Sequence, residues 1–164
     1  MPRLRRAVIF IAIFLSSAGF DQGSKEWARQ TLPAHHARPV IDGYWDWQLE
    51  ENPGAAFSTF VGSPIVLGVI AAIALVALGI AAARTRPEQR LVRASYALIA
   101  GGALGNLVDR VRFGAVTDFV RWHVHEHMWP IFNVADAVLL VGAALLVIER
   151  VLARTKARPR PRPA

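Results

Sequence analysis

Four long apolar stretches constrain the fold of this chain more than any other feature. They run over about residues 7–20, 61–83, 91–108 and 131–152. A helix crosses the ~30 Å hydrocarbon core of a bilayer with ~20 residues. The second and fourth stretches satisfy this length, the third is shorter and glycine-rich, and the first is long enough if its helix continues toward Trp27. We therefore predict an all-α integral membrane protein with four transmembrane helices in a single domain over residues 1–152.

The first apolar stretch also allows a second interpretation. Arg3, Arg5 and Arg6 precede it, and small residues follow at 16–19, as in a cleavable secretory signal. The polar phrase Asp-Gln-Gly-Ser-Lys at 21–25 comes directly afterwards. A phrase of this kind favours a retained membrane anchor, and the signal remains the alternative.

The basic residues predict how the chain is oriented in the membrane. The formal net charge is +7, and 13 of the 19 Lys and Arg residues lie in three segments, at residues 3–6, 84–93 and 150–162. Cytoplasmic segments carry such an excess of positive charge. We therefore expect both termini in the cytoplasm, with the connections at about 21–60 and 109–130 on the outer side.

The C-terminal tail over residues 153–164 is basic and rich in proline. Because its charges follow an apolar stretch, we expect it to be disordered and to face lipid headgroups rather than nucleic acid. The chain has no cysteine, so disulfides and thiolate chemistry are excluded.

The long outer connection, an insertion at about residues 26–60, predicts a small β-sheet on the extracytoplasmic face. Residues 45–50 alternate apolar and polar side chains, which is the period of a half-buried strand. Asn-Pro-Gly at 52–54 is a turn signal, and residues 55–58 lead toward the second span. Tyr44, Trp45 and Trp47 are expected near headgroup level, either as an interfacial aromatic belt or as substrate contacts.

Two aspartates, Asp118 and Asp136, are the leading candidates for chemistry. Carboxylates beside membrane spans are costly to desolvate, and two that meet can share a proton and activate water. Asp136 has a structural alternative, because Asn133 is a good helix N-cap and Asp136 then falls at the third helical position. Asp118 lies between Val116 and Phe119 in a short outer segment and has no such alternative.

Further polar residues are spaced so that each group can share a helix face. Asp21 and Lys25 are four residues apart and can form an ion pair, which could also simply anchor the helix end. Asn106, Asp109 and Arg110 fall on one face of the third span. There they could bind a carboxylate or a carbonyl, or Asp109 and Arg110 could form a charge cluster that faces water.

Gly101 and Gly105 form a small-xxx-small pair within the third span. Such pairs allow two helices to approach closely. We expect helix packing, rather than chemistry, from this pair.

His123, His125 and His127 alternate along the outer segment and raise the possibility of a metal site. Their spacing differs from the helical His-Glu-x-x-His arrangement of metallopeptidases. We therefore expect an interfacial loop and no metal.

Five phrases occur in order along residues 7–152, and together they resemble the lipoprotein signal peptidase family, also called signal peptidase II. The phrases are Asp-Gln-x-Ser-Lys at 21–25, Asn-x-Gly-Ala-Ala-Phe-Ser at 52–58, Gly-Gly-Ala-Leu-Gly-Asn-Leu-x-Asp-Arg at 101–110, Asp-Phe at 118–119 and Phe-Asn-x-Ala-Asp at 132–136.

The resemblance implies an aspartic endopeptidase of the bacterial inner membrane. Such an enzyme removes the signal peptide of a prolipoprotein before a cysteine that carries diacylglyceryl. Asp118 and Asp136 match the catalytic pair. The positions that match the substrate pocket or its support are Asn52, Gly54, Asn106, Arg110, Asn133, Asp21, Lys25 and Asp109. The family has an aliphatic residue where this chain has Thr117, a departure that fits a side chain facing the loop.

The partners that the resemblance implies are diacylglyceryl-prolipoproteins and membrane lipids. No cofactor is needed, and we expect a monomer. Two alternatives stay open at this point. One is a proton-linked transporter subunit in which the aspartates relay protons, and the other is a metallopeptidase that uses the three histidines.

Overall fold

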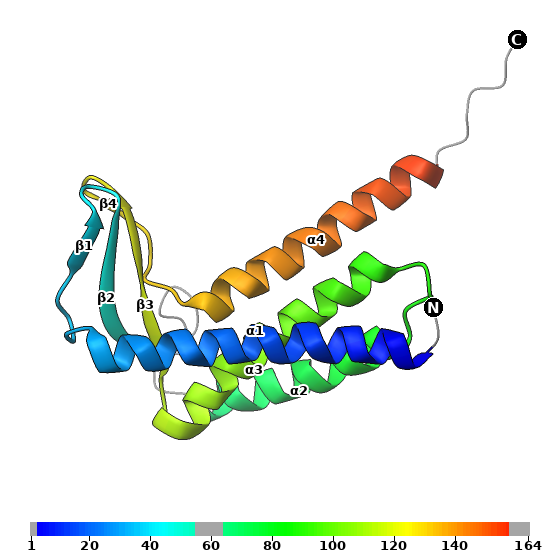
Figure 1. The fold of residues 1–164 in the computed structure, drawn as a ribbon, viewed down its shortest axis with the longest axis horizontal. Coiled ribbons are helices and arrows are strands. Elements are labelled where there is room, and N and C mark those ends of the chain that lie inside the picture. Colours follow the sequence, from blue (N-terminus) through cyan, green and yellow to red (C-terminus); the bar gives the residue numbers. More distant parts are fainter. Residues whose placement is uncertain (1–2, 55–63, 158–164) are drawn as a thin grey trace, which may run out of the picture.

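Four long helices form a bundle, and a small sheet lies at one end of it (Figure 1). The computed structural model describes residues 3–54 and 64–157. The helices are α1 (Arg3–Thr31), α2 (Pro64–Ala83), α3 (Arg90–Phe113) and α4 (Val134–Ala157). The beginning of α1 and the end of α4 both lie away from the sheet (Figure 1). The motif residues 55–58, the predicted start of the second span and the end of the basic tail lie outside the described residues.

Three of the described helices, α1, α2 and α3, are long and apolar enough to cross a membrane. The predicted extension of the first span is confirmed, because α1 continues without interruption to Thr31. Helix α4 is not among the three, since Asp136 interrupts its start and Glu149 and Arg150 interrupt its later turns. A mostly helical membrane protein with a small sheet is therefore confirmed. The fourth crossing and the orientation of the termini remain predictions.

Local sequence signals account for the helix ends that matter most for the site. Helix α1 ends just before Leu32, because Pro33 disfavours a helical conformation at the preceding residue. Helix α3 ends at Gly114, which adopts the left-handed conformation at φ 74° and donates its N–H to the carbonyl oxygen of Arg110 at 3.1 Å. The β-strand that follows therefore leaves α3 at a sharp angle.

Helix α3 lies at the centre of the bundle because its glycines admit two neighbours. A Cβ on Gly101 would lie 2.6 Å from the Cβ of Ser17 on α1, and one on Gly105 would collide with the Asp21 carboxylate. A Cβ on Gly102 would lie 2.6 Å from the carbonyl oxygen of Ala135 on α4. The packing role that we predicted for Gly101 and Gly105 is borne out, because both bring α1 against α3. Gly102 brings α4 against α3 in the same way.

We expect Gly105→Ala to destabilise the protein by ~1–3 kcal/mol, because the added methyl group would displace the Asp21 carboxylate. Gly23→Ala on α1 is the matched control, since no atom lies within 4 Å of the position its Cβ would take. Removing a mid-helix glycine there should leave stability unchanged or raise it by ~0.5–1 kcal/mol. Thermal unfolding in detergent measures both variants. Equal midpoints for the two would contradict the close packing of α1 on α3.

The sheet is antiparallel, with strands in the order β1 (Arg38–Ile41), β2 (Trp45–Asn52), β3 (Val116–Val124) and β4 (His127–Met128). The strand predicted over residues 45–50 is confirmed as β2. We did not predict β3, although it is the longest strand and contains Asp118. Its pairing with β2 places Glu50 opposite Asp118 and Asn52 opposite Val116.

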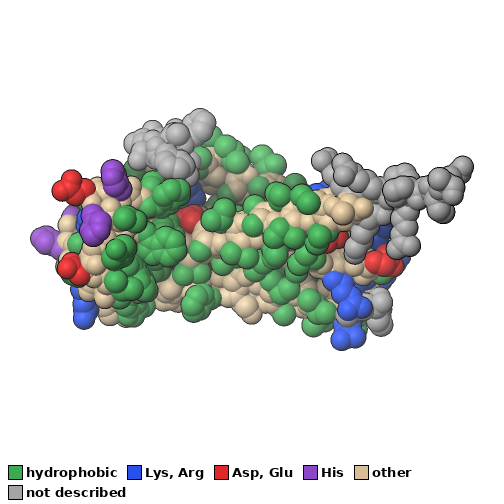
Figure 2. Space-filling view, turned by 90° about the horizontal axis from the view of Figure 1, so that it is seen from above, with side chains coloured by type: hydrophobic (Ala, Val, Ile, Leu, Met, Phe, Trp, Pro, Cys, Tyr) green, Lys and Arg blue, Asp and Glu red, His purple; other side chains and the backbone are tan. Residues whose placement is uncertain are grey.

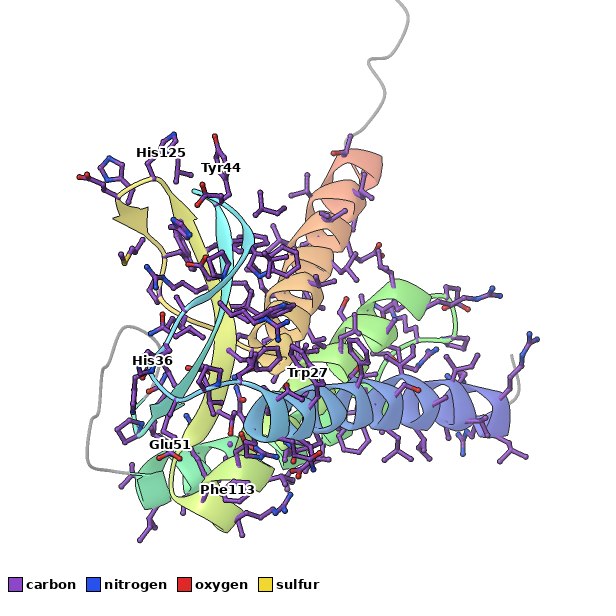
Figure 3. The ribbon with its side chains drawn as sticks, turned by 60° about the vertical axis from the view of Figure 1, so that its left-hand side comes forward. Trp27, His36, Tyr44, Glu51, Phe113 and His125 are labelled. Atoms are coloured by element: carbon purple, nitrogen blue, oxygen red, sulfur yellow. The ribbon has the colours of Figure 1, made fainter. Side chains whose placement is uncertain are left out.

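An apolar cluster joins the sheet to the end of α1. Ala28 from α1, Leu32 directly after α1 and Phe119 from β3 are buried together. Trp47 from β2 packs edge-on against Trp27, with ring centroids 5.2 Å apart. Trp27 marks this junction between α1 and the sheet in Figure 3. The contact fixes the sheet on the bundle, so Trp47 serves packing in addition to any interfacial role.

Candidate active site

Asp118 and Asp136 line one cavity of about 880 Å³ between the sheet and the helices. Asp118 comes from the beginning of β3 and is only 3% exposed. Asp136 comes from the first turn of α4 and is partly exposed. Two elements that are separate in sequence thus direct carboxyl groups into the same space. The predicted proximity of the two aspartates agrees with this geometry.

Three asparagines hold the two carboxyl groups through their side-chain amides. Asn133 donates its Nδ2 to Oδ1 of Asp118 at 2.6 Å, and Asn52 donates its Nδ2 to Oδ2 of the same residue at 3.0 Å. Asn106 donates its Nδ2 to Oδ1 of Asp136 at 3.0 Å. Asn133 also donates to Oδ1 of Asn106 at 3.2 Å, which links the two halves of the site. The three asparagines that the sequence singled out therefore meet at the aspartates.

Asp136 both caps α4 and faces the cavity. Its backbone N–H donates to Oδ1 of Asn133 at 3.0 Å, and its Oδ2 accepts from the backbone N–H of Asn133 at 3.2 Å. This reciprocal pair is a capping box. Asp136 can therefore cap the helix and belong to the site at the same time. Its other carboxylate oxygen, Oδ1, accepts from Asn106 at the cavity.

A fully buried lysine lies behind the asparagines. The Nζ atom of Lys25 lies 2.9 Å from Oδ2 of Asp21 and 3.4 Å from Oδ2 of Asp109, and all three side chains are 0% exposed. The same Nζ donates to Oδ1 of Asn106 at 2.8 Å. Because Lys25 holds this oxygen, the amide nitrogen of Asn106 turns toward Asp136. The predicted Asp21–Lys25 pair is present, whereas a water-facing position for Asp109 is wrong.

Each buried acid also accepts a backbone N–H next to one of the two aspartates. Asp109 accepts at Oδ2 from the N–H of Thr117 at 2.9 Å. Asp21 accepts at Oδ1 from the N–H of Ala135 at 2.8 Å. Since Thr117 precedes Asp118 and Ala135 precedes Asp136, the buried cluster sets the backbone of both residues. Charges buried in this way are stable only when they are fully paired and hydrogen-bonded.

Arg110 borders the cavity and fixes the turn that follows β2. Its Nη2 donates to the carbonyl oxygen of Gly54 at 3.0 Å, and its Nη1 donates to the carbonyl oxygen of Asn106 at 3.2 Å. The N–H of Gly54 donates to Oδ1 of Asn52 at 3.0 Å. The Nε atom of Arg110 is buried and has no hydrogen-bond partner in the part of the chain that the structure describes.

Three participants were not predicted from the sequence. Gln22 donates its Nε2 to Oδ1 of Asp109 at 3.0 Å, and Arg29 donates its Nη1 to Oγ1 of Thr117 at 2.8 Å. The spacing along α1 could have revealed Gln22 and Arg29. Gln22 lies three residues before Lys25, and Arg29 lies four residues after it. Thr117 is buried and binds Arg29, so the expectation that its side chain faces the loop is wrong.

Burial, followed by the nearby charge of Asp136, raises the pKa of Asp118 from 3.8 to about 7. The hydrogen bonds from Asn52 and Asn133 oppose this change without cancelling it. Asp118 is therefore partly protonated near pH 7, where an ordinary aspartate is ionised. One shared proton is the state that such a pair needs for acid–base chemistry.

This raised pKa predicts a pH-dependent stability. Folded Asp118 binds a proton more tightly than unfolded Asp118, so its contribution is greatest at low pH and is lost as pH rises from about 4 to about 7. The loss is ~4 kcal/mol at most. Asp118→Asn lacks this ionisation, so its melting temperature should fall less between pH 5 and pH 8 than that of the parent. Parallel changes in both proteins would contradict a buried, protonated Asp118.

The three histidines lie at the far tip of the sheet, away from the aspartates. The Nε2 atom of His123 lies 3.0 Å from Oδ2 of Asp46. His125 packs on the ring of Tyr44, as Figure 3 shows, with ring centroids 5.6 Å apart. Contrary to the predicted loop, these residues form a hairpin of β3 and β4. Residues 3–54 and 64–157 contain no group of three side chains placed to hold a metal ion.

A bundle of apolar helices that carries two carboxyl groups on one cavity defines a membrane protein with a hydrolase-type site. Figure 2 shows apolar side chains along the body of the bundle and charged side chains toward its ends. The arrangement is consistent with a bundle whose sides contact lipid. Comparison with known proteins then narrows this class.

The sequence model of the family described as signal peptidase (SPase) II matches residues 12–152. A lipoprotein signal peptidase from Xanthomonas campestris pv. campestris is 40% identical over 141 residues, covering 84% of each chain. One from Geobacter sulfurreducens is 39% identical over 154 residues, covering 92% of this chain and 96% of the relative. A solved bacterial membrane enzyme superposes with a TM-score of 0.85 at 28% identity, covering 93% of both chains.

The chain belongs to the signal peptidase II family. The resemblance inferred from the five phrases is thereby confirmed, and the chain is a membrane peptidase with bacterial relatives.

Proposed function

We propose that this protein is an aspartic endopeptidase that removes the signal peptide from diacylglyceryl-modified prolipoproteins. It cuts on the N-terminal side of the modified cysteine, at the outer face of a bacterial inner membrane. The observation that carries the proposal is that Asp118 and Asp136 line one cavity and are linked through Asn133 and Asn106. The resemblance of the catalytic motifs and the family membership support the same assignment.

The reaction follows from the environments of the two aspartates. Asp118 is nearly buried and has a raised pKa, so it holds the shared proton at rest. Asp136 is more exposed to the cavity and acts as the ionised base. It takes a proton from a water molecule, whose oxygen attacks the scissile carbonyl carbon. Asp118 donates its proton to the carbonyl oxygen in the same step.

The tetrahedral intermediate then breaks down while Asp136 gives up its proton and Asp118 takes one back. The proton taken by Asp136 passes to the leaving amine nitrogen while the C–N bond breaks. Asp118 recovers its proton from the hydroxyl group as the new carboxyl group forms. The site thus ends in its starting protonation state, with one water consumed, and no metal or cofactor enters any step.

Arg110 and the asparagines are suited to hold the substrate backbone. Arg110 lines the cavity, and its guanidinium can donate to a peptide carbonyl oxygen. The cavity also has an apolar wall from α4, formed by Leu139, Leu140 and Ala143. A lipid chain or signal-peptide side chain can pack there, and both partition into the bilayer with the substrate.

The position of the carboxyl groups, like the family membership, argues against the proton-linked transporter considered from the sequence. Relay carboxylates are expected within a span and along a conduit. Asp118 lies on a strand outside the helices, and Asp136 lies in the first turn of α4. The two groups therefore meet at the end of the bundle beside the sheet, where a substrate on the membrane surface can reach them.

Cleavage of a diacylglyceryl-modified prolipoprotein by the purified protein in detergent tests the proposal. We expect one cut, located by mass spectrometry directly before the modified cysteine, and no cut in the unmodified precursor. The reaction should be unaffected by EDTA. Absence of cleavage would contradict the proposed substrate, and a loss in EDTA that zinc restores would favour a metallopeptidase.

A further inference from the structure

A second cavity of about 690 Å³ lies at the opposite end of the bundle from the aspartates. It is enclosed by the beginning of α1, the end of α2 and the beginning of α3, which meet on the right in Figure 1. Three arginines line it, namely Arg3, Arg6 and Arg93. A space that concentrates three cations between membrane helices calls for an explanation, since nothing in the peptidase mechanism uses it.

These arginines have no acidic partner. No ion pair joins any of the three to a carboxylate within residues 3–54 and 64–157. Arg93 is only 7% exposed, and its charge is repelled by that of Arg6. The Nε of Arg6 is buried without a hydrogen-bond partner among the described residues. Arg93 is buried and Arg6 is half-buried, while Arg3 is exposed at the rim. Guanidinium groups held in this way without a counter-charge are costly, so the site is suited to an anion.

Arg93 itself is held in place by the loop between α2 and α3. Its Nε donates to Oγ1 of Thr85 at 3.0 Å, and its Nη2 donates to the carbonyl oxygen of Arg86 at 2.9 Å. These bonds leave its remaining nitrogen, Nη1, without a protein partner in the described part of the chain. The guanidinium is therefore preorganised, which lowers the entropic cost of binding an anion.

The remaining lining identifies the kind of anion. Phe10 and Ile11 from α1 and Gly79 and Ala82 from α2 give the cavity an apolar side. Ile11 is 50% exposed on the lateral surface that faces the bilayer. Arginines at the end of an apolar helix surface lie at headgroup depth, where basic pockets between helices bind lipid phosphates. A molecule with a phosphate beside an acyl chain fits both parts of this lining.

We propose that this cavity binds an anionic phospholipid. Arg3, Arg6 and Arg93 surround its headgroup phosphate, and its acyl chain lies against Phe10 and Ile11. The proposal does not rest on the aspartates or on the proposed peptidase activity. Bound lipid would neutralise the arginines and hold α1, α2 and α3 together at this end of the bundle.

Lipid binding to the full-length protein in a neutral detergent tests the proposal. Phosphatidylglycerol and phosphatidylcholine with identical acyl chains are added separately, and inorganic phosphate is added in a third arm. Native mass spectrometry counts bound lipid, and thermal unfolding reports stabilisation. Arg6→Gln is the test variant. Arg5→Gln is the matched control, because Arg5 is exposed, does not line the cavity and carries the same charge one residue away.

We expect phosphatidylglycerol to bind the parent at least fivefold more tightly than phosphatidylcholine and to raise its melting temperature. Arg6→Gln should lose about fivefold in affinity, while Arg5→Gln should bind as the parent does. Equal binding of the two lipids, or equal loss in both variants, would overturn the proposal. Full stabilisation by inorganic phosphate alone would overturn the lipid as the ligand.

Discussion

Replacing either Asp118 or Asp136 with asparagine should abolish peptide cleavage and leave the fold intact. Asparagine preserves the shape of the side chain but cannot take up or release a proton at neutral pH. Acid–base catalysis by one positioned group contributes ~10²–10⁴ in rate, so each variant should lose ~10²–10⁴-fold in kcat. The double variant should lose little more than either single one, because the two groups act as a unit.

The matched control for this pair is Asp46→Asn. Asp46 is also buried, at 6% exposed, but it lies on β2 beside His123 and does not line the cavity. Its variant should cleave at the parental rate, provided that it elutes as a single species in size exclusion. Near-parental cleavage by folded Asp118→Asn or Asp136→Asn would show that the water is activated elsewhere.

Lys25→Met should cause the largest loss of stability of any single substitution considered. The change removes the cation between Asp21 and Asp109, which leaves two fully buried carboxylates facing each other. Breaking a buried pair by removing one partner costs ~3–5 kcal/mol. Asn106 also loses the bond that orients its amide toward Asp136, so cleavage should fall even where the protein stays folded.

Arg112→Met is the control, because Arg112 is an exposed cation at the end of α3. Its free energy of unfolding should match that of the parent within ~1 kcal/mol. The variant with both Asp21→Asn and Lys25→Met should recover part of the loss, because one uncompensated charge is then removed. A Lys25→Met protein as stable as the parent would contradict a charged, buried cluster.

Residues that lie close in sequence were predicted well because their geometry is local. The Asp21–Lys25 pair follows from spacing on one helix, and the capping box of Asn133 and Asp136 follows from its position before an apolar run. The packing of Gly105 was also foreseen, since small residues act through the helix that contains them.

Contacts between distant segments were not predictable in the same way. Strand β3 depends on pairing with β2, which lies more than 60 residues earlier. Residues 120–124 alternate apolar and polar side chains, but the adjacent polar pair at 117–118 and the adjacent apolar pair at 119–120 interrupt the pattern. The bond from Lys25 to Asn106 spans 81 residues and forms only after α1 packs on α3. The site motifs therefore singled out residues that meet around one cavity, without showing how the buried cluster supports the two aspartates.

Helix α1 also sets a distance. It runs unbroken from Arg3 to Thr31, with Arg6 at one end and Asp21 fifteen residues later, which corresponds to ~22 Å along the axis. The hydrocarbon core is ~30 Å thick. With the arginines at one surface, Asp21 and the cavity in front of it lie several ångströms below the other. A rigid helix thus fixes the depth of the cavity, and under the proposed function the scissile bond of a substrate must enter the membrane to that level to be cut.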